Sequence, residues 1–397
     1  MKKVVSIVMA VLMFVMCASV FAACKSGKNS DWEFDKDNNV VIKIGSIGPL
    51  TGDYASYGIS VKNGAQVAVD EINASGKFEG IKFQLMSEDS QGDPTRAVSA
   101  FDKHVDNGMK VSLGGTLSGE TAQIVATSVE SGMLVLTPTA SSLSCIGEPN
   151  AFRVCYNDPQ QGEAAAQEIA KAKMATKIAL FYDNGNDYCT GNVGTFKQKA
   201  AELGLEIVTE QTFTETTNTD FSTQITAIKN SGAEMVFMPI YYAEAARFLH
   251  QAKDQLEVKY FGVDGLDGLI EECGEANKAD CEDVLLLTPF YAAAEGGVTK
   301  AFVDAYKAKF GTVPDQFAAD GYDAVITIAE VVKSFNKTGA QIAEMSVADF
   351  NAAMVAGMVK VTVEGATGTM TWTANGETNK APKILQIKDG AYVEYKA

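Results

Sequence analysis

The sequence predicts an α/β protein made of two similar lobes, each a parallel sheet flanked by helices. Two observations support this fold class. The chain has 397 residues, which is enough for two domains at roughly 150 residues each. Strand-like apolar runs also alternate with segments of helical periodicity, and this alternation occurs in two successive series.

The first series starts at Val40 and alternates without interruption up to Thr137. Strands are predicted at residues 40–47, 81–86, 111–113 and 133–137, and helices at residues 59–72, 94–105 and 121–129. Pro94 stands at the start of its helix, where the missing N–H costs no hydrogen bond.

The second series follows a loop at residues 141–150. Strands are predicted at residues 177–182, 205–208, 235–239, 259–263 and 284–288, and helices at residues 161–172, 193–203, 221–230, 243–255, 300–310 and 317–335. Short strands are expected between residues 359 and 395. We expect these late segments to return and complete each lobe.

The composition excludes several classes of function. With 46% hydrophobic and 21% charged residues, the chain is typical of a soluble globular protein. Its 33 basic and 50 acidic residues give a net charge of −17, which repels a phosphate backbone and makes nucleic acid an unexpected partner. His104 and His250 are its only two histidines, so metal sites and catalytic triads based on histidine are not expected.

The N-terminus is typical of an exported protein. A short basic segment, an apolar run and small residues form a predicted signal peptide at residues 1–23. Val20 to Cys24 resembles a bacterial lipobox, with Phe21 where leucine is usual, so Cys24 is the predicted lipidation site; plain secretion is the alternative. Residues 24–39 are polar and are predicted to be a flexible tether. The expected location is the outer face of the cytoplasmic membrane, or the periplasm.

Export also makes disulfides possible. Beyond Cys24 the chain has five cysteines. Cys145 with Cys155 and Cys273 with Cys281 are plausible local pairs, and an odd number leaves at least one thiol free or the whole set reduced.

No catalytic motif is present, but two hydroxyl-rich turns follow neighbouring predicted strands. Ligands of open α/β sheets bind at the carboxyl ends of the strands. Residues 114–121 contain Ser118 at a helix start, and residues 137–142 form the second turn. The two turns could hold one carboxylate from two sides, although Ser118 could instead only cap its helix.

Asp264 ends a predicted strand of the second series, where a carboxylate could bind an ammonium group. Asp-Gly is also a common turn, so a purely structural role is the alternative. Four tyrosines also follow predicted strands and could wall a pocket or only pack: Tyr57, Tyr188, Tyr241 and Tyr242.

Eight segments, in order, resemble the periplasmic leucine/isoleucine/valine-binding proteins, which are type I periplasmic solute-binding proteins of ABC importers. The opening is similar over residues 44–52, with Tyr57-Gly58, Gly64-Ala65 and residues 70–73. The later segments are Asp89 with Asp93-Pro94, 114–118, 138–141, Phe152-Arg153, Asp187-Tyr188, 242–245 and 321–324. The resemblance covers residues 40–397.

The resemblance implies the two-lobed type I periplasmic-binding-protein fold with three hinge crossovers, near residues 153–158, 288–291 and 365–370. Lobe 1 would comprise residues 40–154 and 290–365, and lobe 2 residues 155–289 and 366–397.

The resemblance also implies the roles of the site residues. Ser118, Thr139, Ala140 and Ser141 would hold the carboxylate or ammonium of an amino acid through hydroxyl and backbone groups. Asp264 would pair with the ammonium and Tyr188 would close over it. The side chain would be bordered by the rings of Tyr57, Tyr242 and Phe317.

The implied function is non-enzymatic: capture of an apolar, branched-chain α-amino acid by hinge closure, without cofactor or metal, and its delivery to the permease subunits of the importer. Two departures from the family pattern bear on the ligand. Cys189 stands where glycine is usual, and Asp264 is shorter than the usual glutamate. An aromatic amino acid or an amide is the alternative ligand. A sensory role is the alternative function, and an exported hydrolase ranks last.

Overall fold

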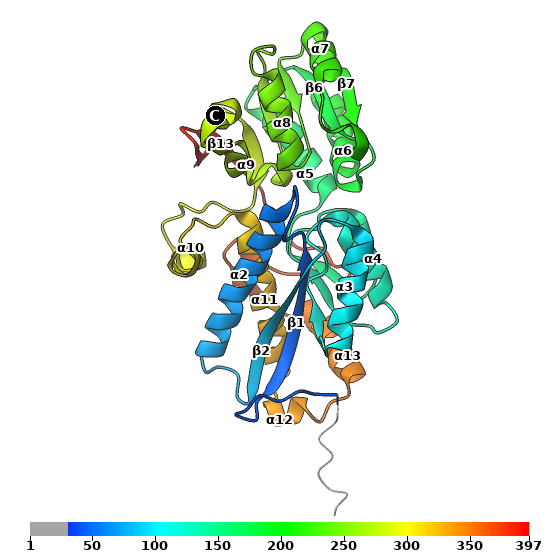
Figure 1. Cartoon of the computed structure of the whole chain (residues 1–397), viewed down its shortest axis with the longest axis vertical. Coiled ribbons are helices and arrows are strands. Elements are labelled where there is room, and N and C mark those ends of the chain that lie inside the picture. Colours follow the sequence, from blue (N-terminus) through cyan, green and yellow to red (C-terminus); the bar gives the residue numbers. More distant parts are fainter. Residues whose placement is uncertain (1–30, 397) are drawn as a thin grey trace, which may run out of the picture.

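The computed structural model describes residues 31–396, and the predicted signal peptide and Cys24 lie outside them. The chain forms two lobes stacked along the long axis of the molecule (Figure 1). Each lobe is a sheet covered by helices, so the predicted fold class is confirmed. Among the described residues, no helix is long and apolar enough to cross a membrane.

The first lobe contains a five-stranded parallel sheet with the strand order β2-β1-β3-β4-β5. Its strands are β1 (Val40–Gly48), β2 (Ile81–Asp89), β3 (Val111–Ser112), β4 (Val135–Thr137) and β5 (Ala151–Arg153). Its helices are α2 (Ala55–Ala74), α3 (Pro94–Asp106), α4 (Ser118–Ser128), α10 (Gly297–Phe310), α11 (Gln316–Ser334), α12 (Gly339–Ile342) and α13 (Val347–Met358). The late helices therefore return to the first sheet, as expected.

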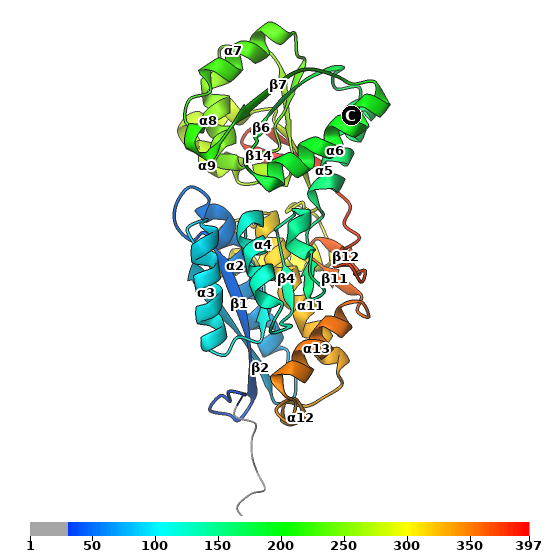
Figure 2. The same cartoon turned by 90° about the vertical axis from the view of Figure 1, so that its right-hand side faces the viewer.

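The second lobe is the upper one in Figure 2. It contains a seven-stranded sheet with the order β14-β13-β10-β9-β8-β6-β7. Its strands are β6 (Lys177–Asp183), β7 (Glu206–Phe213), β8 (Met235–Phe237), β9 (Lys259–Gly262), β10 (Leu285–Thr288), β13 (Lys383–Lys388) and β14 (Ala391–Glu394). Its helices are α5 (Asp158–Lys171), α6 (Asp187–Leu203), α7 (Ser222–Ser231), α8 (Tyr242–Ala252) and α9 (Leu269–Asn277). Strands β13 and β14 run antiparallel and extend the parallel part of the sheet.

Glycines allow α2 and α11 to pack with their backbones in contact. A Cβ atom at Gly64 would lie 1.8 Å from the carbonyl oxygen of Ala318, and one at Gly321 would lie 2.4 Å from that of Val61. This close approach fixes α11, whose first turn carries Phe317, against α2, whose first turn carries Tyr57. Two residues predicted to border the ligand are therefore placed by the same helix pair.

The predicted tether is wrong for residues 31–39. Trp32 is buried, its ring lies 5.1 Å from that of Phe350 in α13, and its indole N–H donates to the carbonyl of Met345 at 3.0 Å. The ammonium of Lys110 lies 5.2 Å above the same indole. One aromatic residue with a buried partner outweighs the polar composition of this segment and packs it onto the first lobe.

The predicted crossover at residues 365–370 is also wrong, because this segment is a hairpin of β11 (Val363–Gly365) and β12 (Gly368–Met370). Met370 and Trp372 are buried in the core of the first lobe. The chain therefore returns to the second lobe only after Trp372, closer to β13. We accordingly propose that residues 366–372 belong with the first lobe.

The five cysteines of the described residues are free thiols, so neither of the plausible pairs, Cys145 with Cys155 or Cys273 with Cys281, is formed, and the alternative of a reduced set describes this structure. The thiols of Cys145 and Cys281 instead donate to the carbonyls of Ser118 and Lys278, at 3.4 and 3.1 Å.

Candidate ligand-binding site

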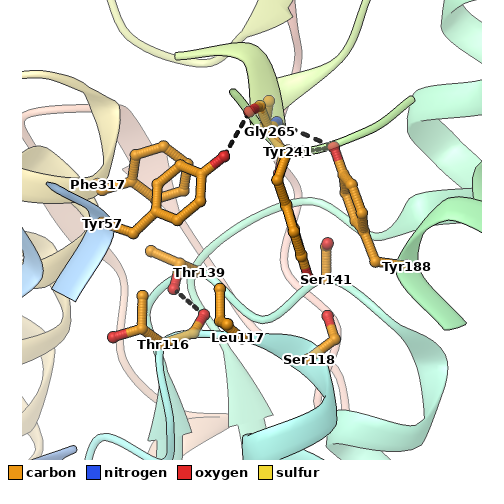
Figure 3. Close-up of a pocket in the computed structure, with 11 residues that line it drawn as sticks. Tyr57, Thr116, Leu117, Ser118, Thr139, Ser141, Tyr188, Tyr241, Gly265 and Phe317 are labelled. Carbon is orange, nitrogen blue, oxygen red and sulfur yellow. Dashed lines mark hydrogen bonds between the residues drawn. The ribbon is translucent and has the colours of Figure 1, made fainter. Parts of the chain in front are cut away.

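A small cavity lies between the two lobes, at the carboxyl ends of the strands (Figure 3). Both lobes line it, through Tyr57, Thr116, Leu117, Ser118, Thr139, Ser141, Tyr188, Tyr241, Asp264, Gly265 and Phe317.

The first lobe presents hydroxyl groups to the cavity. Ser118 is the first residue of α4, and its hydroxyl accepts a hydrogen bond from the N–H of Ser142 at 3.2 Å. It does not cap α4, because the N-cap position is Leu117, whose N–H donates to the carboxylate of Glu120 at 3.0 Å. The Ser118 hydroxyl proton and the start of α4 remain available to an anion.

Thr139 differs from Ser118 because its hydroxyl already donates to the carbonyl of Thr116, at 2.7 Å. Its remaining lone pairs make Thr139 an acceptor toward the cavity. The backbone N–H of Ser141 donates to no group in residues 31–396. One wall of the cavity thus carries both donors for a carboxylate and an acceptor for an ammonium group.

The second lobe contributes one carboxylate, that of Asp264. It accepts hydrogen bonds from the hydroxyl of Tyr188 and the amide of Gln161, each at 2.9 Å. Burial raises the pKa of Asp264 to about 6, an effect that these two hydrogen bonds partly offset. Because a carboxylate can accept about four hydrogen bonds, Asp264 retains the capacity to bind an ammonium group.

Aromatic rings form the remaining walls. The ring centroids of Tyr57 and Phe317 are 4.5 Å apart, and the rings of Tyr188 and Tyr241 are stacked at 5.0 Å with an interplanar angle of 10°. The rings of Tyr57 and Tyr241 are 5.7 Å apart, so they connect the two pairs. An apolar ligand side chain would be buried among these rings.

Polar contacts hold the two lobes together around the cavity. The hydroxyl of Tyr57, from the first lobe, donates to the carbonyl of Gly265 and accepts from the N–H of Tyr242. The hydroxyl of Tyr54 donates to Glu244 at 2.8 Å. Since Gly265, Tyr242 and Glu244 all belong to the second lobe, the structure represents a closed arrangement.

Seven of the nine predicted ligand residues line the cavity. Ala140 and Tyr242 do not. The carbonyl of Ala140 faces Arg153, and Tyr242 packs behind Tyr57 with its ring 4.3 Å away. Its neighbour Tyr241 takes the lining position, because α8 begins at Tyr242 and turns that ring away.

Four lining residues were not among the predicted ligand residues: Thr116, Leu117, Tyr241 and Gly265. Tyr241 had a sequence signal, since it follows a predicted strand. Thr116 and Leu117 lie within the first predicted turn, residues 114–121, in which only Ser118 was predicted to contact the ligand. The carbonyl of Thr116 contributes by fixing the Thr139 hydroxyl.

Two α/β lobes that close on one small cavity with opposed polar groups define a solute-binding protein. The chain matches a family model described as "Periplasmic binding protein" over residues 41–391. It therefore belongs to the periplasmic binding protein family, which is non-enzymatic and extracytoplasmic.

Named relatives agree with this assignment. The chain is 32% identical over 358 residues to "Leu/Ile/Val-binding protein homolog 3" of Brucella melitensis, covering 89% of this chain and 93% of that protein. It is 34% identical to "Leu/Ile/Val-binding protein BraC3" of Rhizobium johnstonii, covering 74% and 78%. The solved structure of LivJ from Streptococcus pneumoniae in complex with isoleucine is 27% identical, with a TM-score of 0.79, covering 89% of this chain and 97% of that one.

Proposed function

We propose that the protein captures a branched-chain α-amino acid outside the cytoplasm and delivers it to the permease of an ABC importer. The observation that carries the proposal is the polarity of the cavity. Asp264 of the second lobe and hydroxyl groups of the first lobe line the same cavity, together with aromatic rings. A zwitterion with an apolar side chain is complementary to all three features. The relatives named for leucine, isoleucine and valine binding support this ligand class.

In the proposed binding mode, the ligand carboxylate accepts from the Ser118 hydroxyl, the Ser141 N–H and the start of α4. The ligand ammonium donates to Asp264 and to the hydroxyl oxygen of Thr139. Charge-assisted hydrogen bonds of this kind are roughly twice as strong as neutral ones. Because the two sets of partners belong to different lobes, only the closed arrangement satisfies both ends of the amino acid.

The ligand therefore shifts the population toward closure, since it binds the closed state more tightly than the open one. The permease would then receive a closed, loaded protein. The aromatic rings leave little space in the closed arrangement, and this favours selection by side-chain size.

A thermal-shift screen of the twenty amino acids, followed by calorimetry, tests the ligand class. Leucine, isoleucine or valine should raise the melting temperature, and Asp264→Asn should weaken their binding by at least about 30-fold, because the ammonium loses its buried charge partner. Asp254→Asn, at an exposed position, is the matched control. Binding of phenylalanine or tyrosine alone would move the specificity to aromatic side chains, and no response to any amino acid would refute the proposal.

We also propose that Cys24 carries a lipid anchor. The lipobox-like sequence at residues 20–24 supports it. Metabolic labelling with a clickable palmitate analogue should modify the wild-type chain and not the Cys24→Ser variant. Equal labelling of both, or labelling of neither, would exclude the anchor.

A further inference from the structure

A buried arginine lies directly behind the turn that faces the ligand carboxylate. Arg153, at the end of β5, is completely buried. Its guanidinium donates to three successive carbonyls of this turn, those of Ala140 and Ser141 through Nη1 and that of Ser142, at 2.9 Å, through Nη2. No sequence motif indicated this contact, because it joins the turn to a strand that follows a long loop.

The hydrogen bonds from Arg153 to these carbonyls fix the direction in which the N–H groups of the turn point. In a trans peptide the C=O and the following N–H point in opposite directions. With the Ala140 and Ser141 carbonyls held on the guanidinium, the N–H groups of Ser141 and Ser142 are directed to the other side of the turn. On that side the Ser142 N–H donates to the hydroxyl of the lining residue Ser118. The peptide dipoles of the turn are therefore aligned with their positive ends toward the cavity.

The charge of Arg153 is balanced by Glu377, which comes from the segment that precedes β13. The Nε atom of Arg153 lies 3.4 Å from Oε2 of Glu377, and the other carboxylate oxygen accepts from the amide of Asn157 at 2.9 Å. The backbone supports the same arrangement, since the indole N–H of Trp372 donates to the carbonyl of Arg153 at 2.7 Å. The guanidinium is thus held in one orientation from both sides.

We propose that Arg153 is a positioning residue for the ligand carboxylate and that Glu377 sets the strength of its effect. Arg153 does not line the cavity. It acts through the peptide groups of residues 140–142, which it orients and polarises, so that a buried positive charge favours an anion on the far side of the turn. This inference rests on the proposed function, because it requires a ligand with a carboxylate.

The experiment compares L-leucine with L-leucinamide, which keeps the ammonium and the side chain but lacks the negative charge. Calorimetry gives the ratio of the two dissociation constants for each protein. Arg153→Gln keeps an amide donor for the carbonyls but removes the charge, and it should reduce the preference for leucine over leucinamide by about tenfold. Glu377→Gln removes the balancing charge, and it should increase that preference.

A merely structural role predicts a different result. A turn that is only loosened would weaken leucine and leucinamide by the same factor, so an unchanged preference in both variants would overturn the inference. If Arg153→Gln fails to fold, an unchanged or reduced preference for leucine in Glu377→Gln would overturn it alone. A wild-type protein that binds no amino acid overturns the proposed function instead, and the two failures are thereby distinguishable.

Discussion

Removal of the Tyr57 hydroxyl should open the protein without emptying its cavity. In the closed structure this hydroxyl donates to the carbonyl of Gly265 and accepts from the N–H of Tyr242, both on the other lobe. In Tyr57→Phe the ring remains, but these two backbone groups lose their partner and are buried on closure. At about 1–2 kcal/mol for each group, closure becomes less favourable by about 2–4 kcal/mol.

Because ligand affinity depends on closure, this change corresponds to a rise in the dissociation constant of leucine of about 30-fold or more. Calorimetry measures the affinity, and small-angle X-ray scattering of the ligand-free protein measures the shift toward a larger radius of gyration. The matched control is Tyr182→Phe, which removes a hydroxyl bound to Glu210 at 2.6 Å within the second lobe. A change of less than threefold in Tyr57→Phe would refute the reasoning, since it would mean that these contacts do not stabilise the closed state.

Three further predictions follow from the site and the packing. Because burial raises the pKa of Asp264 to about 6, protons compete with the ligand ammonium for this carboxylate below that pH. Calorimetry should show an affinity that does not change above pH 7 and that falls below pH 6, whereas the affinity of Asp264→Asn should not depend on pH in this range. A wild-type affinity that does not depend on pH contradicts this role of Asp264. Gly64→Ala should lower the free energy of unfolding by about 1–3 kcal/mol in urea, whereas Gly194→Ala, which meets no atom within 4 Å, should not lower it. Trp32→Ala should lower the free energy of unfolding by about 3 kcal/mol in the same assay, because Trp32 is buried. Asp37→Ala, at an exposed position, should leave it almost unchanged, and equal effects of the two substitutions would support a flexible tether instead.

Most of the fold could be predicted because long strands and helices carry a periodicity that one segment reveals by itself. Strand β5 has only three residues and shows no period, so no strand was predicted there. The second lobe's helix α9 was missed for a related reason, since Gly274 adopts a non-helical conformation inside it. Trp32 shows the reverse error, because a single buried contact overrides the composition of its segment.

The site was predictable where residues follow strands, since strand ends of one sheet meet at one edge. Tyr241 lines the cavity and Tyr242 does not, because a shift of one residue at a helix start rotates a side chain out of the cavity. The hydrogen bonds of Arg153 could not be predicted, because they depend on how a turn and a strand end lie in space.

The order of segments along the chain also has a consequence for export. The first sheet needs helices that arrive only after residue 296, and the second sheet needs β13 and β14, which end at Glu394. A chain still emerging from a translocation channel cannot complete either hydrophobic core, so its stable folding is delayed until nearly the whole chain has passed. Because each lobe is completed by a late segment of the chain, the polypeptide stays unfolded while it is transported, and stable folding follows its release.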